Sequence, residues 1–261
     1  MVVASLTFGA VVGVLLSAGF IWWEVGRYAA PQVPVTVFDE RKVLAAYTVG
    51  LFVGVPLAAA YVLLTVALTN AALPGAAALL IAVVGGGEAA QRFLVRSRYW
   101  GAGPAVPFYA VSFRAGVGGI LALAAVAEYL GSVAAVGAVG LCAALLTATA
   151  LVALEVASGF LSLRPRAQPA ARTPGPLAAA LFCAVAFFLL GIGPSAGPAG
   201  ALLAPVIVLG GSAVTFRGRR GLLAEVPAPG APLPAESPER DRTYGRTAPL
   251  PESSPTESMR K

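Results

Sequence analysis

Long apolar stretches, separated by short polar ones, make up the first 216 residues of the chain. Residues 43–87, 129–154 and 173–216 contain no charged side chain, and each stretch exceeds the ~20 residues that an α-helix needs to cross a hydrocarbon core. The pattern predicts an all-α integral membrane protein with a bundle of about seven transmembrane helices.

Turn-forming residues place the boundaries of these helices. Thr69, Asn70 and Pro74 divide an apolar run that is too long for one crossing, and the sequence GIGPSAGPAG divides the last run. Pro56 and Pro205 are expected to kink the second and seventh helices. The predicted helices span residues 3–26, 43–68, 72–95, 107–130, 132–160, 176–192 and 198–216.

The composition changes at residues 217–261, which are rich in Pro, Ser, Glu and Arg and poor in bulky apolar residues. Such a segment cannot bury enough surface to offset the entropy of ordering, so a disordered cytoplasmic tail is predicted. Its sequence PAPGAPLP favours polyproline II, a conformation that partner proteins bind in aromatic grooves. A solvated tail without a partner is the simpler interpretation.

The basic residues predict the orientation. If the chain crosses seven times, one side receives all four basic clusters, and the positive-inside rule then puts the N-terminus outside and the C-terminus inside. The clusters are Arg27, Arg41 and Lys42; Arg92, Arg96 and Arg98; Arg164, Arg166 and Arg172; and Arg217, Arg219 and Arg220. The net charge of +6 therefore indicates loops that contact anionic lipid headgroups, not nucleic-acid binding. The abundance of Ala, Gly and Arg is typical of GC-rich prokaryotic genomes, so a prokaryotic cell membrane is the expected location.

Several kinds of chemistry are excluded by what the sequence lacks. The chain contains no histidine, which removes His-ligated haem, His-based zinc sites and Ser-His catalysis. Its two lysines, Lys42 and Lys261, fall outside the predicted helices, which excludes a retinal Schiff base. Cys142 and Cys183 lie in different apolar runs without CxxC spacing and are predicted to be buried free thiols. No cofactor, metal or catalytic residue is predicted.

Four ionisable residues inside or at the edge of predicted helices are the candidate site residues: Glu24, Glu88, Arg114 and Glu155. Glu88 lies ~10 Å from the end of the third helix, and Arg114 lies equally deep in the fourth. Because a short loop joins these helices, they are expected to be antiparallel neighbours. A charge at mid-bilayer costs ~2.5–3.5 kcal/mol, so a Glu88–Arg114 ion pair is predicted. Glu155 and Glu24 fall in the same cytoplasmic third.

The candidate cluster has two interpretations. Glu88, Glu155 and Arg114 would line a polar cavity open to the cytoplasm and carry protons or a cation, or they would neutralise one another and lock helix packing. Small-residue motifs add a further expectation, because GxxxG sequences at residues 9–13 and 50–54 allow close helix contact.

Three function classes follow. The first is a small transporter or channel-like protein that uses the cytoplasmic-side charge cluster. The second is a non-catalytic scaffold or subunit of a membrane complex, which binds protein partners through small-residue helix faces or the Pro-rich tail. A lipid-modifying membrane enzyme has the least support, since the chain has no histidine and few polar residues.

Overall fold

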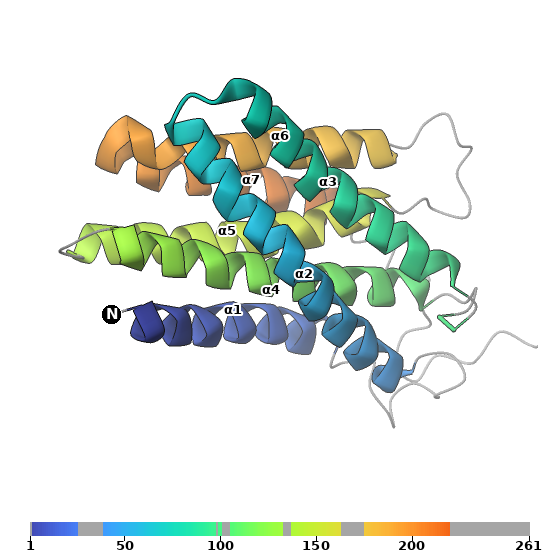
Figure 1. The fold of residues 1–261 in the computed structure, drawn as a ribbon. Coiled ribbons are helices and arrows are strands. Elements are labelled where there is room, and N and C mark those ends of the chain that lie inside the picture. Colours follow the sequence, from blue (N-terminus) through green and yellow to red (C-terminus); the bar gives the residue numbers. More distant parts are fainter. Residues whose placement is uncertain are drawn as a thin grey trace, which may run out of the picture. The chain divides into compact units, whose positions relative to one another are not determined.

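A computed structural model describes residues 2–25, 39–97, 99–100, 105–132, 137–162 and 175–219. The chain divides into two units, Met1–Gly230 and Ala231–Lys261, and every described residue belongs to the first. These residues form seven α-helices and a short 3₁₀ helix (Figure 1). The helices are α1 (Val2–Val25), α2 (Glu40–Thr69), α3 (Leu73–Arg96), α4 (Val106–Ser132), α5 (Ala138–Ser162), α6 (Pro176–Ile192), η2 (Gly193–Ala196) and α7 (Gly197–Arg219).

Six helical segments of this part of the chain are long and apolar enough to cross a membrane. The last of them, Pro176–Arg217, is 42 residues long and contains α6, η2 and α7. The described part of the chain is therefore all-helical, as predicted. The tail from residue 220 onward lies outside the described residues, and α7 continues to Arg219, past the predicted end at residue 216.

Two helix starts differ from the prediction for local reasons. Helix α2 begins at Glu40, not residue 43, because the side chain of Asp39 caps it by accepting a 3.0 Å hydrogen bond from the Arg41 backbone N–H. The predicted start of the fifth helix at residue 132 is wrong, because Ser132 ends α4. Helix α5 begins at Ala138 instead, after Gly137.

Helix α4 is the centre of the bundle and packs against α1, α2 and α5 (Figure 1). Of the 18 residues that form its most apolar stretch, 78% are buried, which is the largest share among the six candidate membrane spans. Three glycines of α4 each face a different neighbour. A Cβ on Gly118 would lie 2.9 Å from the Cα of Val152 in α5, and one on Gly119 would lie 2.6 Å from the Ser17 hydroxyl in α1. One on Gly116 would overlap the backbone of α2. The bare backbone of α4 thus allows three helices to approach closely.

Both predicted GxxxG motifs pack on this same helix. In α1, a Cβ on Gly9 would lie 2.7 Å from the carbonyl oxygen of Leu123, and one on Gly13 would overlap the carbonyl oxygen of Gly119. Higher residue numbers in α1 therefore meet lower numbers in α4, so these two helices are antiparallel. Ser17 of α1 also shares a 2.9 Å hydrogen bond with the Tyr47 hydroxyl of α2.

The second GxxxG motif, in α2, shows that α2 runs parallel to α4. A Cβ on Gly50 of α2 would overlap the carbonyl oxygen of Phe113, and one on Gly54 would lie 2.9 Å from the Cβ of Ile120. Residue numbers rise together along α2 and α4, so these helices are parallel. The close helix contacts expected from the motifs are confirmed, and their common partner is α4.

Helices α6 and α7 fold back on one another. A Cβ on Gly193 would lie 3.0 Å from the carbonyl oxygen of Gly200, while one on Gly211 would lie 3.2 Å from the ring of Phe182. These pairs belong to an antiparallel hairpin, and the reversal occurs at η2. Gly197 follows η2 with a positive φ of 84°, a conformation that glycine adopts without strain. The turn predicted from GIGPSAGPAG is confirmed.

Candidate functional site

Arg114 lies at the centre of a buried charge cluster built by three helices. Its Nη2 donates to Glu88 of α3, and its Nη1 donates to Glu155 of α5 at 2.8 Å. The exposed fractions of Arg114, Glu88 and Glu155 are only 2%, 5% and 3%. The predicted Glu88–Arg114 ion pair is present, and Glu155 joins it.

Two uncharged polar residues complete this group, which is called the Arg114 cluster below. Gln91 of α3 accepts a hydrogen bond from the Arg114 Nε and donates one to the carbonyl oxygen of Gly159 at 3.3 Å. The Ser162 hydroxyl of α5 lies 2.9 Å from both carboxylate oxygens of Glu88. Sequence reasoning missed both residues, although each lies on a helix that carries one of the predicted acids.

Glycines on both sides make room for the arginine. A Cβ on Gly87 of α3 would lie 2.7 Å from the Arg114 Nη1, and a Cβ on Gly159 of α5 would lie 3.0 Å from the Arg114 Cγ. The long side chain therefore passes between two helix backbones. This packing fixes the guanidinium between the two acids and leaves it almost no freedom to turn elsewhere.

The cluster contains two carboxylates and one guanidinium. Arginine stays protonated in proteins, so the group carries a net negative charge whenever both acids are ionised. An uncompensated charge is costly at low dielectric, and uptake of one proton or one cation would remove it. The arrangement is therefore chemically suited to bind and release a single positive charge.

The remaining expectations have mixed outcomes. Glu24 lies in the last turn of α1, and its side chain is outside the described part of the structure. Cys183 is buried as predicted, whereas Cys142 is exposed because it lies on the outward face of α5. The predicted cavity lined by Glu88, Arg114 and Glu155 does not match the cavity described next, since none of the three lines it.

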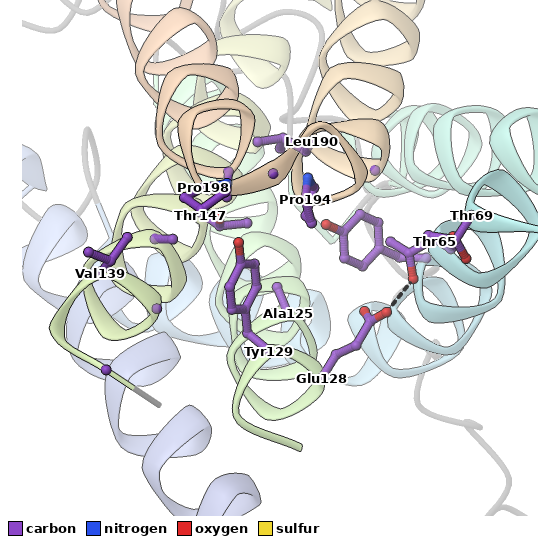
Figure 2. A pocket seen from close by; sticks show the side chains of 17 residues that line it. Thr65, Thr69, Ala125, Glu128, Tyr129, Val139, Thr147, Leu190, Pro194 and Pro198 are labelled. Carbon is purple, nitrogen blue, oxygen red and sulfur yellow. Dashed lines mark hydrogen bonds between the residues drawn. The ribbon is translucent and has the colours of Figure 1, made fainter. Parts of the chain in front are cut away.

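A cavity of about 700 Å³ lies toward the other end of α4. It is bounded by the last residues of α2, α4 and α6 and the first residues of α5 and α7 (Figure 2). Glu128 and Tyr129 line it from α4, and Thr65 of α2 donates a 2.6 Å hydrogen bond to Glu128. With a rise of ~1.5 Å per residue, Glu128 lies ~21 Å farther along α4 than Arg114.

Sequence reasoning also missed Glu128. It lies two residues before the end of the helix predicted at residues 107–130, between the uncharged residues 115–127 and 129–154, so hydropathy treats it as the boundary between two apolar helices. The available signal was its position inside that predicted helix, where an acid next to an apolar run favours a polar partner, although less strongly than Glu88, which lies deeper.

Comparison with known proteins gave no match: no family model, curated protein or solved structure is significantly similar to the chain. The fold and the site therefore define only a class. It is an all-helical protein with six segments long and apolar enough to cross a membrane, built around a buried arginine shared by two acids.

Proposed function

We propose that the chain crosses a prokaryotic cell membrane seven times, with its N-terminus outside and its C-terminus inside. The helix directions support this topology, because α2 is parallel to α4, α1 is antiparallel to α4, and α6 and α7 form an antiparallel hairpin. The described basic residues agree with it. Arg41 is in the first turn of α2, Arg96 is in the last turn of α3, and Arg217 is near the end of α7. Alternating crossings bring these three helix ends to one side.

Cysteine labelling tests this topology. In a Cys142→Ser background, a membrane-impermeant maleimide is expected to label Asn70→Cys in intact cells, because Asn70 follows α2 on the outer side. The same reagent should label Ser97→Cys, which follows α3, only after the membrane is permeabilised. The reverse pattern contradicts the orientation, and labelling of both positions from one side contradicts a crossing by α3.

For the activity, we propose a small transporter in which the Arg114 cluster binds one exchangeable proton. A single observation carries this proposal: two buried carboxylates share one guanidinium, and the three charges come from α3, α4 and α5. Protonation of Glu88 or Glu155 weakens one charge-assisted bond to Arg114. Each protonation state therefore favours a different balance between α3–α4 and α4–α5 packing. Coupling of proton binding to a helix movement requires such a bias.

The second candidate is a non-catalytic scaffold in which the cluster only holds helices together. The burial of the cluster favours this alternative, because Arg114, Glu88 and Gln91 are almost fully buried and hydrogen-bonded. A lipid-modifying enzyme has no comparable support. The two remaining candidates differ in one respect: a transporter exchanges the extra proton with solvent, whereas a scaffold retains it.

Infrared spectroscopy and flux measurements on the protein in liposomes separate these candidates. The wild-type protein is expected to show the C=O stretching band of a protonated carboxylic acid, which disappears in Glu88→Gln and in Glu155→Gln, since either change removes the excess acid. Liposomes that enclose a pH-sensitive dye should lose an imposed pH gradient faster with wild-type protein than with either variant. Glu40→Gln, at an exposed acid of α2, is the matched control and should behave as wild type.

Two outcomes contradict the transporter. Without the carboxylic-acid band in wild-type protein, the cluster holds no extra proton. If the band is present but the gradient decays as slowly as in protein-free liposomes, the proton is structural and the scaffold function takes precedence.

A further inference from the structure

We propose that the cavity at the ends of α2, α4 and α6 binds a small organic cation, an amine or quaternary ammonium with an apolar body, with Glu128 as its counter-ion. The cavity is separate from the Arg114 cluster, and none of the charged residues Glu88, Arg114 and Glu155 lines it. Its charge, its size and its aromatic side chains lead to the same class of ligand.

The charge of the cavity selects for a cation. Among the described residues that line it, Glu128 is the only carboxylate, and there is no Lys or Arg. The Glu128 side chain is partly buried, so its charge is only partly screened by solvent. A ligand ammonium placed beside it supplies the positive partner that the lining residues lack, and an anionic ligand would be repelled.

The carboxylate is held in place by a neighbouring helix. The Thr65 hydroxyl of α2 donates a 2.6 Å hydrogen bond to one oxygen of Glu128, as Figure 2 shows by a dashed line. Thr65 is itself buried, with 8% of its surface exposed. This bond orients the carboxylate from the α2 side, and the second oxygen can accept from a ligand N–H. Such pre-orientation lowers the entropic cost of binding.

The size and the walls of the cavity fit an organic molecule and not a metal ion. A volume of about 700 Å³ lies within the ~300–1,000 Å³ typical of small-molecule sites. No group of three or more His, Cys, Asp or Glu that could hold a metal occurs among the described residues. Most of the remaining wall is apolar, with Leu190, Pro194 and Pro198 among its residues. Such a wall suits a hydrocarbon or aromatic body attached to the charged group.

Aromatic rings add a second attraction for a cation. Tyr61 of α2 and Tyr129 of α4 both line the cavity, and a ring face attracts an ammonium within ~6 Å of its centre. Tyr61 is held by a tilted contact with Phe187 of α6, whose ring centre is 5.8 Å away. The combination of one carboxylate with tyrosine rings recognises ammonium groups in general, whether primary or quaternary.

The idea that the organic cation is transported rests on the proposed function. In that case, its entry from the outer end would be driven or balanced by a proton bound at the Arg114 cluster. As a bound ligand, it does not depend on transport. Binding and flux therefore have to be measured separately.

The binding test compares three probes of similar shape and different charge: phenethylammonium, 2-phenylethanol and 3-phenylpropanoate. Equilibrium binding to the full-length protein in lipid nanodiscs is measured, with empty nanodiscs to subtract partitioning into lipid. Phenethylammonium is expected to bind about 10- to 100-fold tighter than the alcohol, the range of a charge-assisted hydrogen bond, and the carboxylate weakest of all. Glu128→Gln should abolish the preference for the ammonium, Glu128→Asp should retain it, and Glu40→Gln should leave it unchanged.

Equal binding of ammonium and alcohol by the wild-type protein overturns the proposal, even if Glu128→Gln fails to fold, and indicates an apolar site such as one for lipid chains. A cation preference that persists in Glu128→Gln also overturns it. Uptake of radiolabelled phenethylammonium into liposomes tells the two proposals apart. Binding through Glu128 without uptake rejects the transporter and keeps the site, while uptake that is insensitive to Glu128→Gln keeps the transporter and rejects this site.

Discussion

Replacing Arg114 with glutamine is expected to lower the free energy of unfolding by ~3–5 kcal/mol, because the change leaves two buried carboxylates without a cation. Replacing Glu88 with glutamine is expected to change it by less than ~1 kcal/mol, because the amide still accepts hydrogen bonds and the remaining Arg114–Glu155 pair is neutral. Unfolding curves of the purified protein in detergent measure both changes. The asymmetry follows from the count of two acids to one base.

Arg92→Gln is the matched control, since Arg92 is an exposed arginine of α3 only four positions from Glu88. Its effect on unfolding should stay within ~0.5 kcal/mol. If Glu88→Gln is as destabilising as Arg114→Gln, and the double variant recovers most of the loss, the pair is a balanced structural bridge. That result removes the excess charge on which the proton-binding proposal depends.

The depth of Glu88 and Arg114 along their helices could be predicted from the sequence, because a single charged residue stands out in an apolar stretch. Glu88 and Arg114 interrupt apolar runs at similar depths on helices joined by a short loop, which was sufficient to predict their ion pair. Gln91 and Ser162 were not predicted, because uncharged polar side chains carry a small hydropathy penalty and occur on many helix faces. Only the three-dimensional packing determines which of them turn toward Arg114.

Helix boundaries were predicted correctly where turn-forming residues such as Asn and Gly mark them, and were misplaced where such residues gave no clear signal. Asn70 follows the end of α2 as predicted, and Gly197 caps the 3₁₀ turn and begins α7. The start of α5 was placed too early, because residues 129–154 are uncharged throughout and hydropathy gives no boundary within them. At the start of α2, Asp39 is a recognisable N-cap residue, but a boundary placed by hydropathy alone does not take capping into account.

The partners of the small-residue motifs were beyond sequence reasoning. A GxxxG motif indicates that one face of a helix has no side chains and allows close contact, but it does not indicate which helix packs on that face. Both motifs pack on α4, whose glycines at positions 116 and 119 face α2 and α1 without a GxxxG spacing of their own. Likewise, the cavity lined by Glu128 depends on five helix ends meeting, and no local pattern encodes that.

A single methyl group at Gly50 is expected to destabilise the protein by ~1–3 kcal/mol, the usual cost of overpacking a close contact. An alanine Cβ there would overlap the carbonyl oxygen of Phe113 and lie 3.2 Å from the Cα of Gly116. Both obstacles are backbone atoms, which cannot turn aside as a side chain can, so α2 and α4 must move apart. Unfolding in detergent measures the loss for Gly50→Ala.

Gly85→Ala is the control for this change, because an added Cβ at Gly85 of α3 has no atom within 4 Å. Alanine also favours a helix over glycine by ~1 kcal/mol, so this variant should be as stable as wild type or more stable. Equal stability of the two variants would mean that α2 does not rest on the α4 backbone at Gly50. The parallel direction of α2 and α4 would then lose its support, and so would the alternating topology inferred from it. A selective loss at Gly50 instead ties the position of α2 to that of α4. Because Phe113 is adjacent to Arg114, the same contact also holds the arginine at the depth where its two acids meet it.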